Sequence, residues 1–206
     1  MHPNILCKEQ QELLPLIQQF KREFYLVGGT AIALQIGHRR SIDFDLFKLS
    51  NLNASKTLKK LDITKIPYTI TRRVDGQINL IINSVKLTFF QYPYSIEAKL
   101  EFEKYVRMPD LITLAAMKAY ALGYRSKWKD YVDLYFIIKD HYSVQDIADE
   151  ATKIYGNHFA EKLFRQQLAF HKDIDYREEV DYLIPNPPKD SDIREKLIDI
   201  ALCDVC

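Results

Sequence analysis

The segment between residues 24 and 47 constrains the fold more than any other part of this chain. Four apolar or aromatic residues run into Gly28-Gly29, a helical pattern follows, and a second short apolar strand carries Asp43 and Asp45. Successive side chains on a strand point to opposite faces, so the two aspartates share one face. The other face belongs to Ile42, Phe44 and Leu46. Two carboxylates at this spacing repel each other, and a divalent cation or a basic side chain between them relieves the repulsion.

The glycine pair suits phosphate binding. Gly28-Gly29 ends a strand and opens a helix, so backbone N–H groups meet an anion with no side chain in the way. Thr30 adds a hydroxyl to the same phosphate or caps the helix, and the two roles are compatible. Arg39 and Arg40 are candidates for contact with phosphate or an RNA backbone. The alternatives for them are a solvated loop or pairing with the two aspartates.

Further along, the pattern predicts a mixed α/β half followed by a helical half. Helices are expected at 8–22, 30–36 (closed by Gly37) and 53–61, and strands at 24–27, 42–47, 67–74, 77–83 and 85–92. Asp75-Gly76 and Asn83-Ser84 supply hairpin turns. After Met108 helical patterns dominate, at 109–122, 128–139, 143–155, 157–170 and 190–202. We therefore expect an α/β core at residues 1–107 and a helical region at 108–206.

Two stretches resemble a known family. The order of strand, Gly-Gly, helix and Asp-x-Asp resembles the signature of polymerase-beta-type nucleotidyltransferases, and GGTAIALQIGHRRSIDFDLF resembles its AbiEii/AbiGii toxin-like branch. The segment MPDLITLAAMKAYALGYRSKWKDYVDLYFII, residues 108–138, resembles that branch's later motif of Lys, Arg, Lys-Asp and Asp-Leu. The resemblance covers residues 24 to 140. It implies an α+β polymerase-beta-like nucleotidyltransferase fold, with a mixed N-terminal sheet and a helical C-terminal half.

The resemblance also implies an activity. Such an enzyme transfers a nucleoside monophosphate from an NTP to a hydroxyl, with Mg²⁺ held by Asp43 and Asp45 between the protein and the triphosphate. The implied partners are an NTP, an RNA end such as that of a tRNA, and a cognate antitoxin, in a toxin–antitoxin or phage-defence setting. The alternative, from a different class, is a catalytically inert nucleotide-binding or protein-interaction module on the same fold.

Three charged residues of the later motif lie on helical faces that the pattern predicts to be buried. Lys118 follows Leu114 by four residues and precedes Leu122 by four, which places it on an apolar stripe. The resemblance implies that it contacts nucleotide phosphates. Asp130 and Asp133 share an inward face of the next helix and either orient Lys118, contact the acceptor or form an ion-pair lattice between the helices. Pairing of Asp133 with Lys129 on the surface is a further alternative.

The strand at 85–90 departs from the family pattern. A third carboxylate is usual there, where it completes the metal site and takes the proton of the attacking hydroxyl. This chain offers Lys86 and Thr88 on the polar face instead. Thr88 is neutral and a poor base, which is the motive for the inert-module alternative.

Composition excludes several classes. The chain has 206 residues, 47% of them hydrophobic, and a net charge of +1, so global charge does not indicate a nucleic-acid binder. It has no apolar run long enough to span a bilayer and no signal-peptide pattern, so we expect a cytoplasmic protein. The three cysteines do not form a disulfide framework, and the pair Cys203 and Cys206 is expected to be functionally silent.

Overall fold

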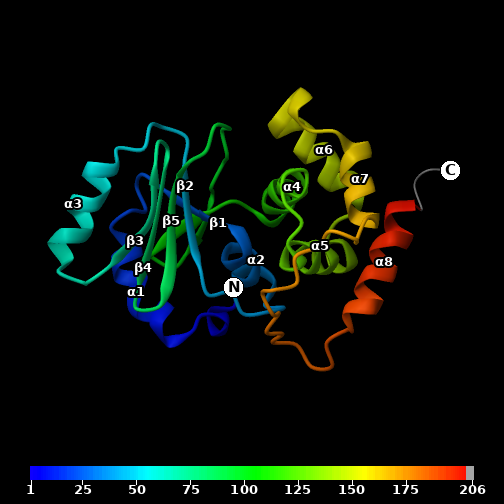
Figure 1. The fold of residues 1–206 in the computed structure, drawn as a ribbon, viewed down its shortest axis with the longest axis horizontal. Coiled ribbons are helices and arrows are strands. Elements are labelled where there is room, and N and C mark those ends of the chain that lie inside the picture. Colours follow the sequence, from blue (N-terminus) through cyan, green and yellow to red (C-terminus); the bar gives the residue numbers. More distant parts are fainter. Residues whose placement is uncertain (203–206) are drawn as a thin grey trace. The chain divides into compact units, whose positions relative to one another are not determined.

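The computed structural model describes residues 1–202 and divides the chain into two compact units (Figure 1). Unit 1 comprises Met1–Asp110, and unit 2 begins at Leu111. Within the described residues all named strands lie in unit 1, and unit 2 is built from helices. This arrangement confirms the expected α+β class. Cys203 and Cys206, with the expectation attached to them, lie outside the described residues.

Unit 1 is built on a five-stranded sheet with the order β1-β2-β5-β4-β3. Neighbouring strands are antiparallel except for β2 and β5, which are parallel. The strands are β1 (Tyr25–Val27), β2 (Phe44–Lys48), β3 (Thr69–Val74), β4 (Gln77–Ile82) and β5 (Val85–Gln91). The helical elements of this unit are η1 (Pro3–Ile5), α1 (Lys8–Gln18), α2 (Gly28–Ile36) and α3 (Ala54–Thr64).

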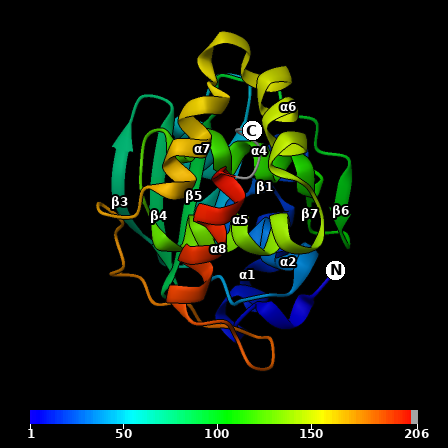
Figure 2. The same ribbon diagram turned by 90° about the vertical axis from the view of Figure 1, so that its right-hand side faces the viewer.

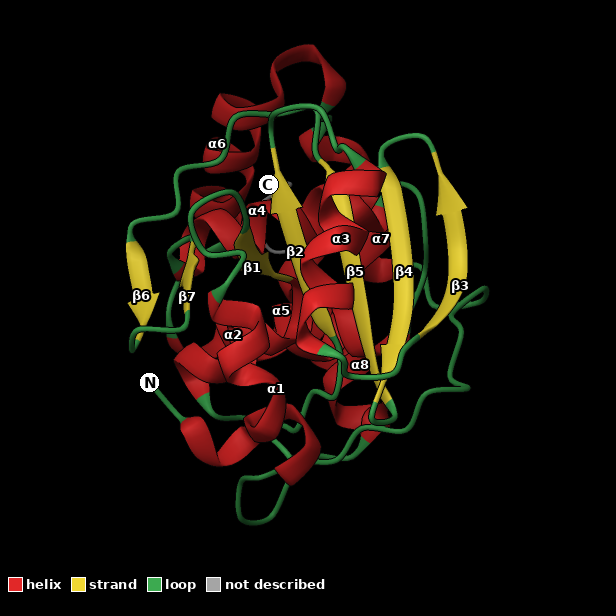
Figure 3. Cartoon of the chain, turned by 90° about the vertical axis from the view of Figure 1, so that its left-hand side faces the viewer, coloured by secondary structure: helices red, strands yellow, loops and turns green. Residues whose placement is uncertain are grey.

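One face of this sheet forms the core of unit 1. Figures 1 and 3 show α1 and α3 on this side of the strands. Phe20, just after α1, packs its ring 4.8 Å from that of Phe89 on β5, and Phe24 completes the cluster at 5.1 Å from Phe89. Six strand residues at the centre of this face are at most 1% exposed: Phe44, Leu46, Ile78, Leu80, Leu87 and Phe89. Period-two alternation therefore leaves the intervening residues on the opposite face.

Strand β2 begins later than the sequence pattern suggests. Its first residue is Phe44, so Ile42 and Asp43 precede the strand, and Ile42 is 53% exposed instead of buried. The pairing of β1 with β2 ends at Val27 and Asp45, because the chain turns into α2 at Gly28 and offers no further partner. The expected Ile42–Phe47 strand is thus corrected to Phe44–Lys48.

The hairpins between β3, β4 and β5 form where the turn residues predict them. Gly76 has φ of 69°, and Asn83 and Ser84 have φ of 48° and 66°, the left-handed values that tight hairpins require. A second hairpin was not predicted: β6 (Leu100–Phe102) pairs antiparallel with β7 (Val106–Met108). Each of these strands has three residues, too few for alternation to be visible in the sequence.

Unit 2 contains five α-helices within the described residues (Figure 2). They are α4 (Leu111–Leu122), α5 (Trp128–Asp140), α6 (Val144–Tyr155), α7 (Glu161–Ala169) and α8 (Asp190–Leu202), with the short η2 (Gly156–His158) between α6 and α7. Helix α4 packs against α6, and α7 packs against α8. The expected helix at 157–170 is shorter than predicted, because η2 occupies its first residues. Among residues 1–202, no helix combines the length and apolar character needed to cross a membrane.

Candidate functional site

The glycine turn and the first strand carboxylate lie against each other in unit 1. Gly28 has φ of 73°, and a Cβ added to it would lie 2.6 Å from Oδ2 of Asp45. Any other residue would be strained at this φ and would collide with the carboxylate. Helix α2 begins at Gly28, so its positive N-terminal end adjoins Asp45. The sequence predicted that the glycine turn faces Asp45, and the structure shows how closely Gly28 approaches it.

Asp43 is held through its backbone. The Thr30 hydroxyl donates a hydrogen bond to the carbonyl of Asp43 and lies 2.9 Å from Oγ of Ser41. Thr30 is the third residue of α2 and is 2% exposed, and the residue before the helix is Val27, so Thr30 is not the N-cap. Its hydroxyl instead holds the turn that contains Asp43 and leads into β2.

The two arginines of the 39–40 pair differ. Arg39 is 2% exposed, which rules out a solvated loop as its environment. Its Nη1 donates to the carbonyl of Arg40 at 2.9 Å, and a Cβ on Gly29 would lie 2.5 Å from its Nη2. Arg40 is partly exposed. The guanidinium of Arg39 therefore lies against the second glycine of the turn, beside the start of α2.

Asp45 begins a row of side chains that crosses the sheet. In register, Asp45 pairs with Thr88, Thr88 with Asn79, and Asn79 with Arg72. Directly paired residues on neighbouring strands point to the same side, so these four share the face opposite the core. Thr88 thus lies beside Asp45 on the neighbouring strand, as expected, and is 7% exposed. That it takes the place of a third carboxylate stays a prediction.

The donor set at this place fits a magnesium ion that arrives with a nucleotide. Asp43 and Asp45 offer hard oxygen ligands, and Mg²⁺ in nucleotide sites is held by one or two carboxylates together with substrate phosphates. Among the described residues, no group of three or more His, Cys, Asp or Glu side chains is placed to hold a metal. Asp45 adjoins the start of α2 and Asp43 precedes β2, so binding of one ion by both carboxylates stays a prediction.

Unit 2 contains a buried cluster of charged residues. Lys118 Nζ contacts Oδ1 of Asp130 and lies 2.9 Å from Oδ2 of Asp133. The exposed fractions of these three residues are 6%, 2% and 0%. Arg125 donates from Nε to Oδ2 of Asp130 at 3.0 Å. The buried helix faces predicted from periodicity are confirmed, and the structure forms the ion-pair lattice that was one of the alternatives for Asp130 and Asp133.

The charge balance of this cluster keeps Asp130 ionised. Burial alone would raise the pKa of Asp130, but Lys118 and Arg125 outweigh it and hold that pKa below its usual value. Pairing of Asp133 with Lys129 on the surface is wrong: Lys129 lies 3.7 Å from Glu178, and Asp133 is turned inward. The cluster is therefore a balanced set of two cations and two carboxylates.

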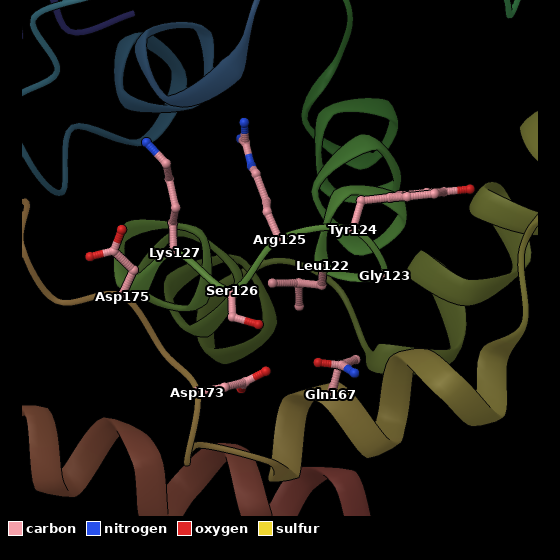
Figure 4. A pocket seen from close by; sticks show the side chains of 9 residues that line it. All are labelled: Leu122, Gly123, Tyr124, Arg125, Ser126, Lys127, Gln167, Asp173 and Asp175. Carbon is pink, nitrogen blue, oxygen red and sulfur yellow. The ribbon is translucent and has the colours of Figure 1, made fainter.

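A pocket of about 460 Å³ lies next to this cluster, also in unit 2 (Figure 4). Figure 4 shows Ser126, Gln167 and Asp173 turned toward one another, while Arg125 and Lys127 extend away from them. The segment beyond α7 closes one side, because Asp175 accepts a hydrogen bond from the Trp128 backbone and donates one to the Ser126 backbone. Arg125 both lines the pocket and binds Asp130, so it links the two features.

Several residues of these sites were missed in the sequence. Arg125 is the Arg of the later family motif, but its contact with Asp130 was not predicted, and its spacing of five residues from Asp130 is the one local signal for that contact. Ser41 carried no signal, because its role depends on the position of Thr30. Asn79 and Arg72 join the row at Asp45 through strand order, which pairs β5 with β2 and β4, and periodicity does not encode that order.

Comparison with known proteins identifies the chain. Residues 64–198, more than half of it, match the family model described as nucleotidyl transferase AbiEii toxin, type IV toxin–antitoxin system. The chain belongs to the AbiEii family. The predicted resemblance to AbiEii/AbiGii-type nucleotidyltransferases is thereby confirmed, and the family is one of nucleotidyltransferase toxins.

The similarity of this AbiEii member to other proteins covers most of the chain. An uncharacterized protein of Aquifex aeolicus (strain VF5) is 28% identical over 190 residues, 85% of this chain and 86% of the relative. A Helicobacter pylori protein assigned as a nucleotidyltransferase has a similar structure, with a TM-score of 0.58, 17% identity and coverage of 96% of this chain and 95% of that one. The MenT4 nucleotidyltransferase toxin of Mycobacterium tuberculosis H37Rv gives a TM-score of 0.62 at 15% identity, covering 96% and 82%. These two structural likenesses show the fold and confirm that it is that of nucleotidyltransferases.

Proposed function

We propose that this chain is a Mg²⁺-dependent nucleotidyltransferase that moves a nucleoside monophosphate from an NTP to the hydroxyl of an RNA end, such as that of a tRNA. The observation that carries the proposal is the contact between Gly28 and Asp45, which sets a carboxylate against the open N-terminus of α2. An anionic triphosphate bound at the helix N-terminus would lie beside a carboxylate ligand for its metal ion. Membership of the AbiEii family supports a toxin–antitoxin or phage-defence setting, with a cognate antitoxin as partner and the cytoplasm as the place of action.

Each residue has a role in this proposal. Gly28, Gly29 and Thr30 form the start of α2, which receives the phosphates, and the buried Arg39 adds positive charge beside it. Arg40 is partly exposed, and its role in this proposal is to contact phosphate from the surface side. Mg²⁺, when bound by Asp43 and Asp45, would stabilise the charge that develops on the attacking and leaving oxygens.

The reaction is an in-line displacement at phosphorus. The acceptor oxygen forms a bond to the α-phosphorus, the bond from that phosphorus to the bridging oxygen breaks, and pyrophosphate leaves. Thr88 is uncharged at neutral pH and takes no proton. The proton of the acceptor hydroxyl therefore passes to an ionised group, and the one that adjoins Thr88 in register is Asp45.

The test is transfer of label from an α-labelled NTP to RNA. Wild-type protein with Mg²⁺ and total RNA should label the RNA, and Asp45→Asn should abolish the label while the free energy of unfolding without metal holds or rises, since removing one of two like charges relieves repulsion. A control is Asp140→Asn at the exposed end of α5. Strong destabilisation of Asp45→Asn without metal would instead assign Asp45 to a structural ion pair.

Lys118 requires a separate proposal. Its ammonium already contacts two carboxylates, so a nucleotide phosphate would compete with them for it. We propose that a nucleotide phosphate competes successfully for this ammonium, so that Lys118→Met weakens NTP binding by about 1 to 3 kcal/mol, the loss expected for a charged hydrogen bond. Asp133→Asn disturbs the same cluster but keeps the ammonium. Titration of NTP into Lys118→Met and Asp133→Asn distinguishes phosphate contact from structural support. Equal losses of NTP affinity would mean that the cluster only supports the fold.

The inert-module alternative rests on Thr88, which stands beside Asp45 where an acid would add a third ligand. In that case the protein binds NTP through the same residues and never labels RNA. NTP binding by the wild type together with absence of label on any added RNA would favour it.

A further inference from the structure

The face of the unit 1 sheet opposite the core extends from Asp45 across strands that the proposed nucleotide site does not use. This face carries the row of Asp45, Thr88, Asn79 and Arg72. At its β1 end this face is covered, because Tyr25 and Val27, which pair with Phe47 and Asp45, are only 6% and 2% exposed. On the other strands the further residues of this face are partly or fully exposed, in contrast to the core face, and they are Phe47, Thr69, Val74, Gln77, Ile81, Lys86 and Phe90. We call these residues, with the row, the open face. Asp45 is its only carboxylate.

The open face is positively charged away from Asp45. Lys86 and Arg72 are both exposed, and neither forms an ion pair within the part of the chain that the structure describes. Strand β3 is an edge strand of the sheet, and all six of its residues are exposed, the cations Arg72 and Arg73 among them. Two cations without internal partners on a surface that is continuous with a metal-binding carboxylate are complementary to an anionic chain.

Arg72 lies too far from Asp45 to serve the same phosphate group. Three strand-to-strand steps separate them, about 14 Å at the usual spacing of 4.8 Å. The proposed NTP has its phosphates at Gly28 and Asp45, and an arginine side chain does not span that separation. Arg72 is therefore placed to bind a phosphate of a second molecule. That molecule would lie over β5, β4 and β3, on the far side of Asp45 from β1.

Aromatic rings flank the row. Phe47 and Phe90 are paired in register two residues beyond Asp45 and Thr88, with ring centroids 5.0 Å apart. Tyr92 packs against Phe47 at 5.2 Å and fixes its orientation. Both phenylalanines remain partly exposed although they pack against each other. Aromatic side chains on an open sheet stack on unpaired bases, whereas bases inside a duplex are not accessible to them.

We infer that the open face is the binding surface for the single-stranded 3′ end of the RNA acceptor, with Phe47 and Phe90 stacking on unpaired bases and Arg72 and Lys86 holding the backbone. This inference rests on the proposed function and specifies its acceptor as unpaired RNA. The acceptor would approach Asp45 across β5 and β4. The partner class follows from charge and shape together, because the exposed Arg72 and Lys86 are complementary to a phosphate backbone and the partly exposed rings can stack on unpaired bases.

The chain provides a matched control for the test. Arg72 and Arg73 are adjacent on β3, and both are exposed, but Arg72 pairs with Asn79 on the open face and Arg73 pairs with Ile78 on the core side. Arg72→Ala and Arg73→Ala therefore remove the same charge from opposite faces of one strand. Phe90→Leu removes the aromatic ring while keeping an apolar side chain, which protects the packing with Phe47.

The experiment measures anisotropy of a labelled single-stranded RNA of about ten nucleotides, within the usual site size of 4 to 16, without NTP or Mg²⁺. Arg72→Ala should weaken binding about tenfold and reduce the slope of log K against log salt by about 0.7, as for one phosphate contact to a single strand. Phe90→Leu should weaken it about fivefold or more, because stacking on one base is lost, and Arg73→Ala should weaken it by less than about twofold. A fully paired RNA should not respond to Phe90→Leu. Thermal melts of all variants show whether each is folded.

Several results would overturn the inference. Equal losses for Arg72→Ala and Arg73→Ala would indicate nonspecific attraction, and losses in NTP affinity in place of RNA affinity would assign the face to the nucleotide. The transfer assay separates this inference from the proposed function. If RNA binds through Arg72 and Phe90 but is never labelled, the surface stands and the transferase proposal fails. If Arg72→Ala and Phe90→Leu label RNA with an unchanged KM for RNA, the transferase proposal stands and the assignment of the open face to RNA fails.

Discussion

At the scale of single residues, the candidate site depends on one close approach. Gly28 adopts a left-handed φ and leaves no room for a Cβ next to Asp45. The sequence predicted that glycine belongs at this turn, because the strand-to-helix turn and phosphate access both require it. It also predicted that the glycine turn faces the aspartates, but not how closely Gly28 approaches Asp45, since that depends on the antiparallel pairing of β1 with β2.

Gly28→Ala should therefore affect stability and function together. We expect a loss of about 1 to 2 kcal/mol in the free energy of unfolding, since alanine is strained at positive φ. The added methyl group should also displace the Asp45 carboxylate and weaken Mg²⁺-dependent NTP binding. Gly123→Ala is the control, because a Cβ there first meets the Tyr120 carbonyl at 3.4 Å. Chemical unfolding and NTP titration would check both, and an unchanged NTP affinity in Gly28→Ala would contradict the assigned site.

At the scale of elements, the hydrophobic pattern predicted which helices and strands exist better than it predicted where each begins and ends. The helices α4, α5, α6 and α8 lie within two residues of expectation, because each has a long apolar stripe. Short strands were the weak point, as β6 and β7 show. Buried polar contacts between helices were predicted only as alternatives, because periodicity tells which face is buried and not which atoms meet there.

The lattice between α4 and α5 makes stability depend on pH. The pKa of Asp130 is lowered in the folded protein, so its charge stabilises the fold above its unfolded pKa of 3.8. That contribution is lost as pH falls below this value and through the lower folded pKa. Asp130→Asn should cost about 3 kcal/mol at pH 7, because it leaves Lys118 and Arg125 with one fewer buried partner. The difference from wild type should shrink below about pH 4.

The control for this pH dependence is on the same helix. Asp140 is half-exposed and lies 3.7 Å from Lys139, so Asp140→Asn should change stability by less than about 1 kcal/mol at any pH. Urea unfolding at several pH values would measure both. A penalty for Asp130→Asn that stays constant down to pH 3 would contradict the ionised lattice.

At the scale of the whole molecule, the fold was more predictable than the activity. Strand, glycine turn, helix and Asp-x-Asp, together with the later Lys and Lys-Asp helices, were enough to indicate a nucleotidyltransferase fold, and the AbiEii match confirms the family. Activity depends on side chains that a fold does not specify. The position that distinguishes the two proposals is Thr88, which pairs in register with Asp45.

Thr88→Asp tests whether the molecule as a whole is an enzyme. The new carboxylate would lie on the face and at the register of Asp45, so it should tighten Mg²⁺ binding by adding a hard anionic ligand. If the wild type already labels RNA, another ionised group accepts the proton, and Thr88→Asp should raise the rate by supplying a closer base. Lys86→Asp is the control: it adds the same acid to the same face of β5, two residues away, and should leave metal binding unchanged.

A wild type that binds NTP without labelling RNA, and a Thr88→Asp variant that labels it, would show that this chain is an inert member of an active fold. Equal effects of the two substitutions would remove Thr88 from the metal site, because the register argument predicts that only position 88 adjoins Asp45.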